Sequence, residues 1–170
     1  MHGARSGFDF FTAGELPAPT LPAEEVAAVV RERWGLDVTL EPLGSQQDQN
    51  FLARAAGERS VGPVGVVKIT NPAFTSVELA AQDAAAERIA AASPGFRIAT
   101  TSTAPGTPCA VVADTSEGPL AIRLIDYLPG GTLNGDAYLS PAVIARMGEL
   151  AARASLALAG FEHPGLERVL

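Results

Sequence analysis

The spacing of hydrophobic residues is the feature that most restricts how this chain can fold. Apolar residues recur at helical spacing from residue 21 to Trp34, and Gly35 ends that pattern. Residues 36–43 then alternate apolar and polar side chains, as a half-buried strand does, and residues 51–56 and 64–70 read as two further strands. The first half of the chain is therefore predicted to form a helix followed by an antiparallel meander of three strands.

The second half of the chain is also predicted to contain both helices and strands. Thr75 or Ser76 can cap a helix that runs to about residue 92, and residues 97–101, 109–113 and 120–128 resemble two or three short strands. Residues 129–135 read as a linker before a last helix, which starts at Ser140 and Pro141 and runs to residue 159. We predict an α+β fold, in which about five antiparallel strands carry helices on one side and a linker leads to one further helix.

Composition excludes several classes of protein. With 47% hydrophobic and 18% charged residues in 170, the chain can bury a core. A formal charge of −7 argues against a nucleic-acid partner and against an anionic membrane surface, since both need clustered Lys and Arg. Cys109 is the only cysteine, no run of about 18 apolar residues is present, and the N-terminus does not read as a signal peptide. We expect a cytoplasmic protein whose first 20 residues form a mobile tail.

One polar loop and one lysine are the candidate functional residues. The loop, residues 43–51, is opened by Gly44 between two strand-like runs, and Lys68, the only lysine in the chain, lies near the end of the next run. Phosphate sites need backbone N–H groups that approach oxygen closely and a reachable cation, and these two segments can supply both. Two other interpretations remain: the loop can be a plain hairpin, and the lysine a solvated edge residue.

The order of these elements is that of the small lobe of a protein-kinase-like fold. The chain resembles the aminoglycoside phosphotransferase/choline kinase superfamily, most closely its hydroxylysine-kinase-like branch, which also occurs N-terminal to class III aminotransferases. The resemblance covers about residues 22–170 and is carried by residues 44–51, 67–72 and 123–131 and by Gln82. It implies a nucleotide-binding small lobe over residues 21–129, and a linker with the first helix of a large lobe over residues 130–170.

The resemblance also implies roles for individual residues. The bound nucleotide would be ATP or GTP with magnesium, and Lys68 would meet its α- and β-phosphates. The residues that would cover the phosphates are Gly44, Ser45 and Gln46. The residues that would form the hinge, where the backbone pairs with the base, are Asp126, Tyr127 and Leu128.

A carboxylate on the second helix commonly pairs with the lysine in this superfamily. The expected position, two residues after Gln82, is occupied by Ala84. Glu78, one turn before Gln82, is the substitute that we expect, and Glu87 is the other candidate. A third alternative is that neither glutamate pairs with Lys68.

The residues that move a phosphoryl group are not found in this sequence. The superfamily takes its catalytic Asp and its magnesium ligands from a His-Gly-Asp loop and a later Asp in the large lobe, and His163 followed by Pro164 does not match that loop. We therefore expect a nucleotide-binding lobe that does not catalyse alone, from a protein that phosphorylates a small hydroxyl- or amine-bearing metabolite. There are two alternatives. One is a degenerate kinase-like domain that only binds or regulates, for example within a protein fused to an aminotransferase. The other is an interaction module that binds no nucleotide.

The last helix provides the expected partner surface. Its apolar side is formed by Val143, Met147, Leu150, Ala154 and Leu158. Together with residues 161–170 this side would pack on the large lobe of the parent protein. In the isolated chain we expect it to drive self-association.

Overall fold

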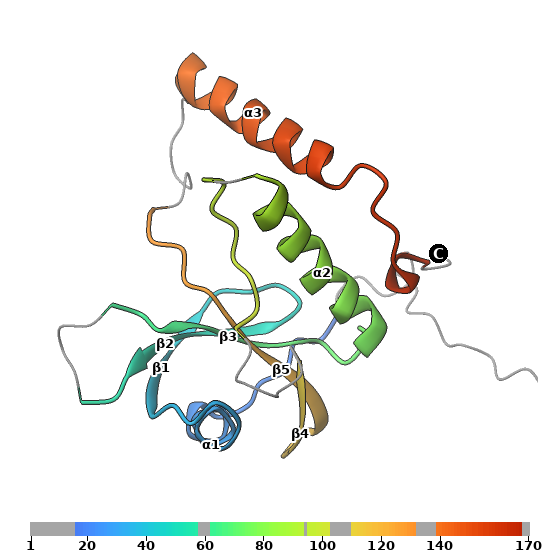
Figure 1. Cartoon of the computed structure of the whole chain (residues 1–170). Coiled ribbons are helices and arrows are strands. Elements are labelled where there is room, and N and C mark those ends of the chain that lie inside the picture. Colours follow the sequence, from blue (N-terminus) through green and yellow to red (C-terminus); the bar gives the residue numbers. More distant parts are fainter. Residues whose placement is uncertain (1–15, 58–61, 94, 103–109, 132–138, 168–170) are drawn as a thin grey trace, which may run out of the picture.

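The computed structural model describes residues 16–57, 62–93, 95–102, 110–131 and 139–167 (Figure 1). The elements, in chain order, are α1 (Ala23–Trp34), β1 (Val38–Leu43), β2 (Gln49–Ala55), β3 (Gly65–Ile69), α2 (Ser76–Ala92), β4 (Val111–Thr115), β5 (Gly118–Ile125), α3 (Pro141–Ala157) and the short 3-10 helix η1 (Pro164–Leu166). The predicted α+β class is confirmed. Parts of the predicted tail, the turn after Gly57, Cys109, the linker beyond Gly131 and residues 168–170 lie outside the described residues.

The sheet has five strands in the order β1-β2-β3-β5-β4, and every neighbouring pair is antiparallel. β3 is the central strand, and its Lys68 lies opposite Asn50 of β2 and Arg123 of β5. Residues 97–101, which could have been a strand, form only a single bridge, from Thr101 to Ile125. Their neighbour Ser102 nevertheless donates its N–H to Leu124 O, so this segment borders the last part of β5.

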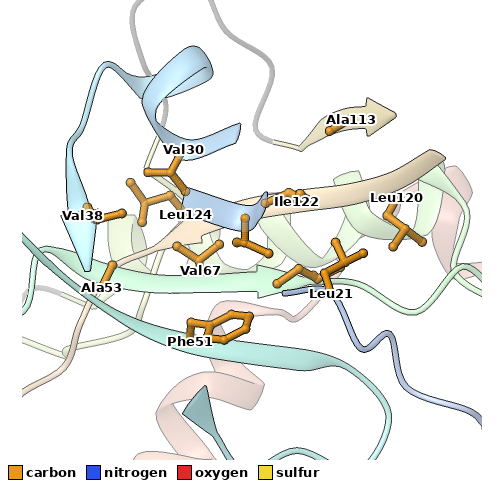
Figure 2. Packing of buried hydrophobic residues seen from close by; sticks show 12 residues of the cluster. Leu21, Val30, Val38, Phe51, Ala53, Val67, Ala113, Leu120, Ile122 and Leu124 are labelled. Carbon is orange, nitrogen blue, oxygen red and sulfur yellow. The ribbon is translucent and has the colours of Figure 1, made fainter. Parts of the chain in front are cut away.

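The helices α1 and α2 cover opposite faces of the sheet (Figure 1). The prediction that the helices lie on one side of the sheet is therefore wrong. Alternate residues of a strand point to opposite faces, and both faces of the central strands contain buried side chains. The face toward α1 is apolar, and Figure 2 shows its buried side chains spread along the sheet beneath that helix. Its buried strand residues are Val38, Phe51, Ala53, Val67, Ile69, Ala113, Leu120, Ile122 and Leu124. The face toward α2 instead carries a row of polar side chains, which is formed by Asn50, Lys68 and Arg123 on neighbouring strands.

Side chains from the N-terminal part of the chain hold α1 on the sheet. Glu25 accepts hydrogen bonds from the N–H and the hydroxyl of Ser116, both at 2.7 Å, in the turn between β4 and β5. These two bonds lower the pKa of the Glu25 carboxyl below its ordinary value. Next along the chain toward the N-terminus, Thr20 donates its N–H and its hydroxyl to Glu117 Oε1. Part of the segment 16–20, expected in the mobile tail, therefore contacts the rest of the fold, and Leu16 and Pro19 are buried.

The N-terminus of α2 carries a capping box. The Thr75 hydroxyl accepts the N–H of Glu78, and Glu78 Oε2 accepts the N–H of Thr75 at 2.7 Å. Two N–H groups that lack partners inside the helix are satisfied in this way. The predicted start of this helix is confirmed.

Thr75→Ala is expected to lower the free energy of unfolding by about 1 kcal/mol, because the Glu78 N–H loses its acceptor. Urea denaturation followed by circular dichroism measures the change. Ser76→Ala, at the exposed first position of the same helix, is the matched control and should change stability by less than about 0.5 kcal/mol. Equal stability of the two variants would contradict a capping role for Thr75.

The C-terminal part of the chain folds back along α2. α3 lies beside α2, and residues 161–167 then return to the N-terminal half of α2 (Figure 1). Arg88 of α2 donates to the carbonyls of Ala157 and Ala159, which tethers the end of α3. At Gly165 the approach to α2 is so close that a Cβ atom would lie 2.2 Å from Val77 O, so only glycine fits without displacement.

α3 buries only part of its apolar surface. Of the predicted apolar side, Val143, Leu150, Ala154 and Leu158 are half-buried, whereas Met147 is exposed. Ile144 and Leu156 are also exposed. Within the described ranges, no helix combines the length and the apolar character needed to cross a membrane.

Candidate functional site

The loop between β1 and β2 is open to solvent and closes with a serine turn. Residues 44–47 are exposed, and a Cβ atom at Gly44 would meet nothing within 4 Å. The Ser45 hydroxyl accepts the N–H of Asp48 at 3.2 Å, which bends the loop back toward β2. Gly44, Ser45 and Gln46 are thus exposed to solvent, and Gly44 has room for a side chain.

Lys68 reaches this loop and pairs with Asp48. The Lys68 Nζ lies 2.5 Å from Asp48 Oδ2, and the two side chains are only 25% and 13% exposed. The other carboxylate oxygen, Oδ1, accepts the N–H of Asn71 at 2.9 Å. Asp48 therefore joins the loop to the lysine and to the start of the connection between β3 and α2. Sequence reasoning placed Asp48 in the loop but did not assign it as the partner of Lys68.

Asn71 is the second residue that fixes the base of the loop. This buried side chain donates through Nδ2 to Gln47 O and to Pro17 O, both at 2.9 Å, and its Oδ1 accepts the N–H of Ala73. One amide thus joins the loop, the N-terminal segment and the connection to α2. The remaining tie comes from Gln49, whose side chain exchanges two hydrogen bonds of 2.8 Å with the backbone of Leu21. Only the base of the loop is held, and its tip is left exposed.

The carboxylates that sequence reasoning considered for Lys68 lie elsewhere. Glu78 accepts hydrogen bonds from Thr75 in the capping box of α2, and Glu87 is exposed on the same helix. The ion pair of Lys68 is made with Asp48 instead. The loop, rather than the helix, therefore supplies the carboxylate.

α2 uses its buried acid for a different cation. Asp83 Oδ1 accepts from Arg123 Nη1 at 3.0 Å and from the Thr101 hydroxyl at 2.7 Å, while Arg123 Nη2 donates to Gln82 Oε1. Asp83 and Arg123 are 7% and 3% exposed, so this is a buried ion pair. It fixes α2 against β5 directly beside Lys68, because Lys68 and Arg123 are neighbours across the sheet.

The buried pair was missed because its partners are 40 positions apart and an arginine inside a strand usually lies at the surface. The available signal was Asp83, a charged residue in an otherwise alanine-rich part of the helix. Three buried polar atoms near this row, Asn50 Oδ1, Asp83 Oδ2 and Arg123 Nε, have no hydrogen-bond partner among the described residues. The face toward α2 therefore contains buried polar atoms in addition to those that form its ion pairs.

The predicted hinge follows β5 and is only partly free. Asp126 accepts from the N–H and the hydroxyl of Thr100 through Oδ2 and donates its own N–H to Thr100 O. Tyr127 and Leu128 are exposed, and no backbone hydrogen bond joins them to another described residue. Their backbone groups are therefore without a backbone partner among the described residues, whereas the Asp126 N–H is already used.

Distance along the sheet relates the hinge to the lysine. Lys68 lies opposite Arg123, three residues before Asp126, so the hinge begins about 10 Å away along the strand. Leu43, Leu52 and Val66 belong to the same face, because Leu43 is paired with Asn50, and Asn50 with Lys68. Of these residues, the half-buried Val66 lies on the side of Lys68 toward the hinge, whereas Leu52 beside it is buried and Leu43 is level with Lys68.

Metal ligands are not gathered in the part of the chain that the structure describes, where no three His, Cys, Asp or Glu residues lie together as a metal-binding group.

Comparison with known proteins does not identify a family, because no family model and no curated protein matches the chain.

Proposed function

We propose that this chain is the nucleotide-binding lobe of a small-molecule phosphotransferase and binds ATP or GTP through Lys68. The observation that carries the proposal is the position of the only lysine of the chain, on the central strand and in contact with the glycine-opened loop. A lysine on the third strand beneath such a loop is the phosphate-binding arrangement of kinases. The order of helices and strands, which is the order that the resemblance implies, supports the same proposal.

The nucleotide would extend from the hinge to the loop. Its base would lie against the half-buried Val66 and the exposed Leu43, and its edge would meet the backbone around Leu128. Its phosphates would meet Lys68 and the backbone N–H groups of the loop. Val66, Lys68 and the open loop follow one another in this order along one face of the sheet, which supports a nucleotide whose base lies toward the hinge and whose phosphates lie toward the loop.

Catalysis would depend on the large lobe that the resemblance implies for the parent protein. Phosphoryl transfer needs a base or orienting Asp and magnesium ligands, which that lobe would supply. The exposed Ile144 and Met147 on α3 would contribute apolar contact to it.

Lys68→Ala is expected to weaken the binding of magnesium-ATP by about 10- to 100-fold, because a charge-assisted hydrogen bond to phosphate is lost. Isothermal titration calorimetry on the 170-residue chain measures the dissociation constant. Arg54→Ala is the matched control, since it removes one positive charge from an exposed position of β2 far from the loop. Equal affinity of the wild type and Lys68→Ala would refute the phosphate role of Lys68.

A degenerate domain that binds or regulates without transferring phosphate is the second candidate. The observation that favours it is the neutralised lysine, since Lys68 is paired with Asp48 and the buried acid of α2 is used by Arg123. Such a domain could serve the fused aminotransferase that the resemblance implies. Transfer of labelled γ-phosphate to small hydroxyl or amine compounds, assayed with the full-length parent protein, separates the two: turnover indicates a kinase, and binding without turnover a degenerate domain.

A further inference from the structure

The Asp48 carboxylate occupies the place at Lys68 that a phosphate oxygen would take. Its Oδ2 lies 2.5 Å from the Lys68 Nζ, so the two groups are in direct ion-pair contact. Both side chains are largely shielded from water, so the attraction between them is stronger than at an exposed site. Together the two groups carry no net charge, and an approaching anion therefore meets no net positive charge at this point.

The loop is also built so that this contact can open. The tip, residues 44–46, is exposed, and Gly44 has no neighbour that would restrain an added Cβ atom. The base is anchored by Gln49 to Leu21 and does not depend on the ion pair. The Asp48 side chain is held by Lys68 and by the Asn71 N–H, so releasing it breaks two specific contacts while the anchored base of β2 stays in place.

We propose that Asp48 is an intramolecular competitor for the phosphate at Lys68, so that nucleotide binds only by exchanging its phosphate for this carboxylate. The inference rests on the proposed function, because it takes the phosphates to Lys68. It adds a regulation of that site: the observed affinity equals the intrinsic affinity multiplied by the fraction of molecules in which Asp48 has left the lysine. Any change that favours the released carboxylate then tightens nucleotide binding without a new contact to the nucleotide.

Asp48→Asn tests the exchange with little change in shape. The amide oxygen can still accept the Asn71 N–H, but the charge that holds Lys68 is gone. We expect the dissociation constant for magnesium-ATP, measured by isothermal titration calorimetry, to fall by about tenfold or more. Asp114→Asn is the matched control, since it makes the same charge change at an exposed position of the edge strand β4, and its affinity should equal that of the wild type.

The double variant Asp48→Asn/Lys68→Ala separates exchange at the lysine from a general gain in positive potential. If Asp48 competes only for Lys68, the gain from Asp48→Asn disappears when Lys68 is alanine. A gain of the same size in both backgrounds would overturn the proposal, and so would an unchanged or weaker affinity of Asp48→Asn alone.

The outcomes also separate this inference from the proposed function. In one outcome, the wild type binds magnesium-ATP with an affinity that Lys68→Ala lowers and Asp48→Asn leaves unchanged. This result would reject competition by Asp48 and would support the nucleotide site. Binding by Asp48→Asn and none by the wild type supports both. Absence of binding by the wild type and by Asp48→Asn overturns both. Hydrogen exchange provides a readout without nucleotide: the amide of residue 48, whose N–H the Ser45 hydroxyl accepts, should exchange faster in Asp48→Asn than in Asp114→Asn, and equal rates would overturn the proposed hold on the loop.

Discussion

Asp83→Ala is expected to lower the free energy of unfolding by about 3–5 kcal/mol, which is a large part of the stability of a domain of this size. The variant leaves the Arg123 guanidinium buried without its carboxylate, and the Thr101 hydroxyl loses its acceptor as well. Removal of one partner of a buried ion pair is costly because the other charge stays in a medium that solvates it poorly. Urea denaturation followed by circular dichroism and by Trp34 fluorescence measures the effect.

Glu87→Ala is the matched control, because Glu87 is an exposed acid on the same helix. Its stability should differ from that of the wild type by less than about 0.5 kcal/mol. A second comparison uses Asp83→Leu/Arg123→Met, which replaces the whole pair by apolar residues and should recover most of the loss. If Asp83→Ala were as stable as Glu87→Ala, the buried pair would have no structural role.

Phe51→Ala is the second change with a large expected effect, again about 3–5 kcal/mol. Phe51 lies on β2, opposite Pro42 of β1 and Val67 of β3, and is 2% exposed in the cluster under α1. Figure 2 shows its ring within the group of side chains that includes Val67 and Leu21. Truncation removes the ring and leaves a cavity that the surrounding strands cannot close completely.

Thermal and urea unfolding of Phe51→Ala, compared with Val112→Ala, checks this prediction. Val112 is a strand residue that is 61% exposed, so its truncation should cost less than about 1 kcal/mol. Similar losses in the two variants would mean that the face under α1 is not the main core.

Local sequence signals were sufficient to predict most elements. α1, β1, β2, β3, α2 and α3 each lie within about two residues of the predicted segment. α1, β1 and α3 were predicted from the period of their apolar residues, whereas α2 was predicted from its capping residues and its alanine content. Residues 97–101 were ambiguous because they are short and bounded by turn residues, and only Thr101 forms a bridge. The packing of part of residues 16–20 was missed because contacts such as Thr20 with Glu117 join positions 97 residues apart.

The sequence determined where the helices and strands lie and which residues are unusual, among them the polar loop and the only lysine, Lys68. Both are properties of local spacing and composition. Only the tertiary structure decided which carboxylate meets which cation: Asp48 pairs with Lys68, and Asp83 with Arg123. Ion pairs of this kind are set by strand register and by the face on which α2 packs, and neither is encoded within one segment. The candidate site was predicted from the sequence as a loop and a lysine, and the structure adds Asp48, the acid that joins them.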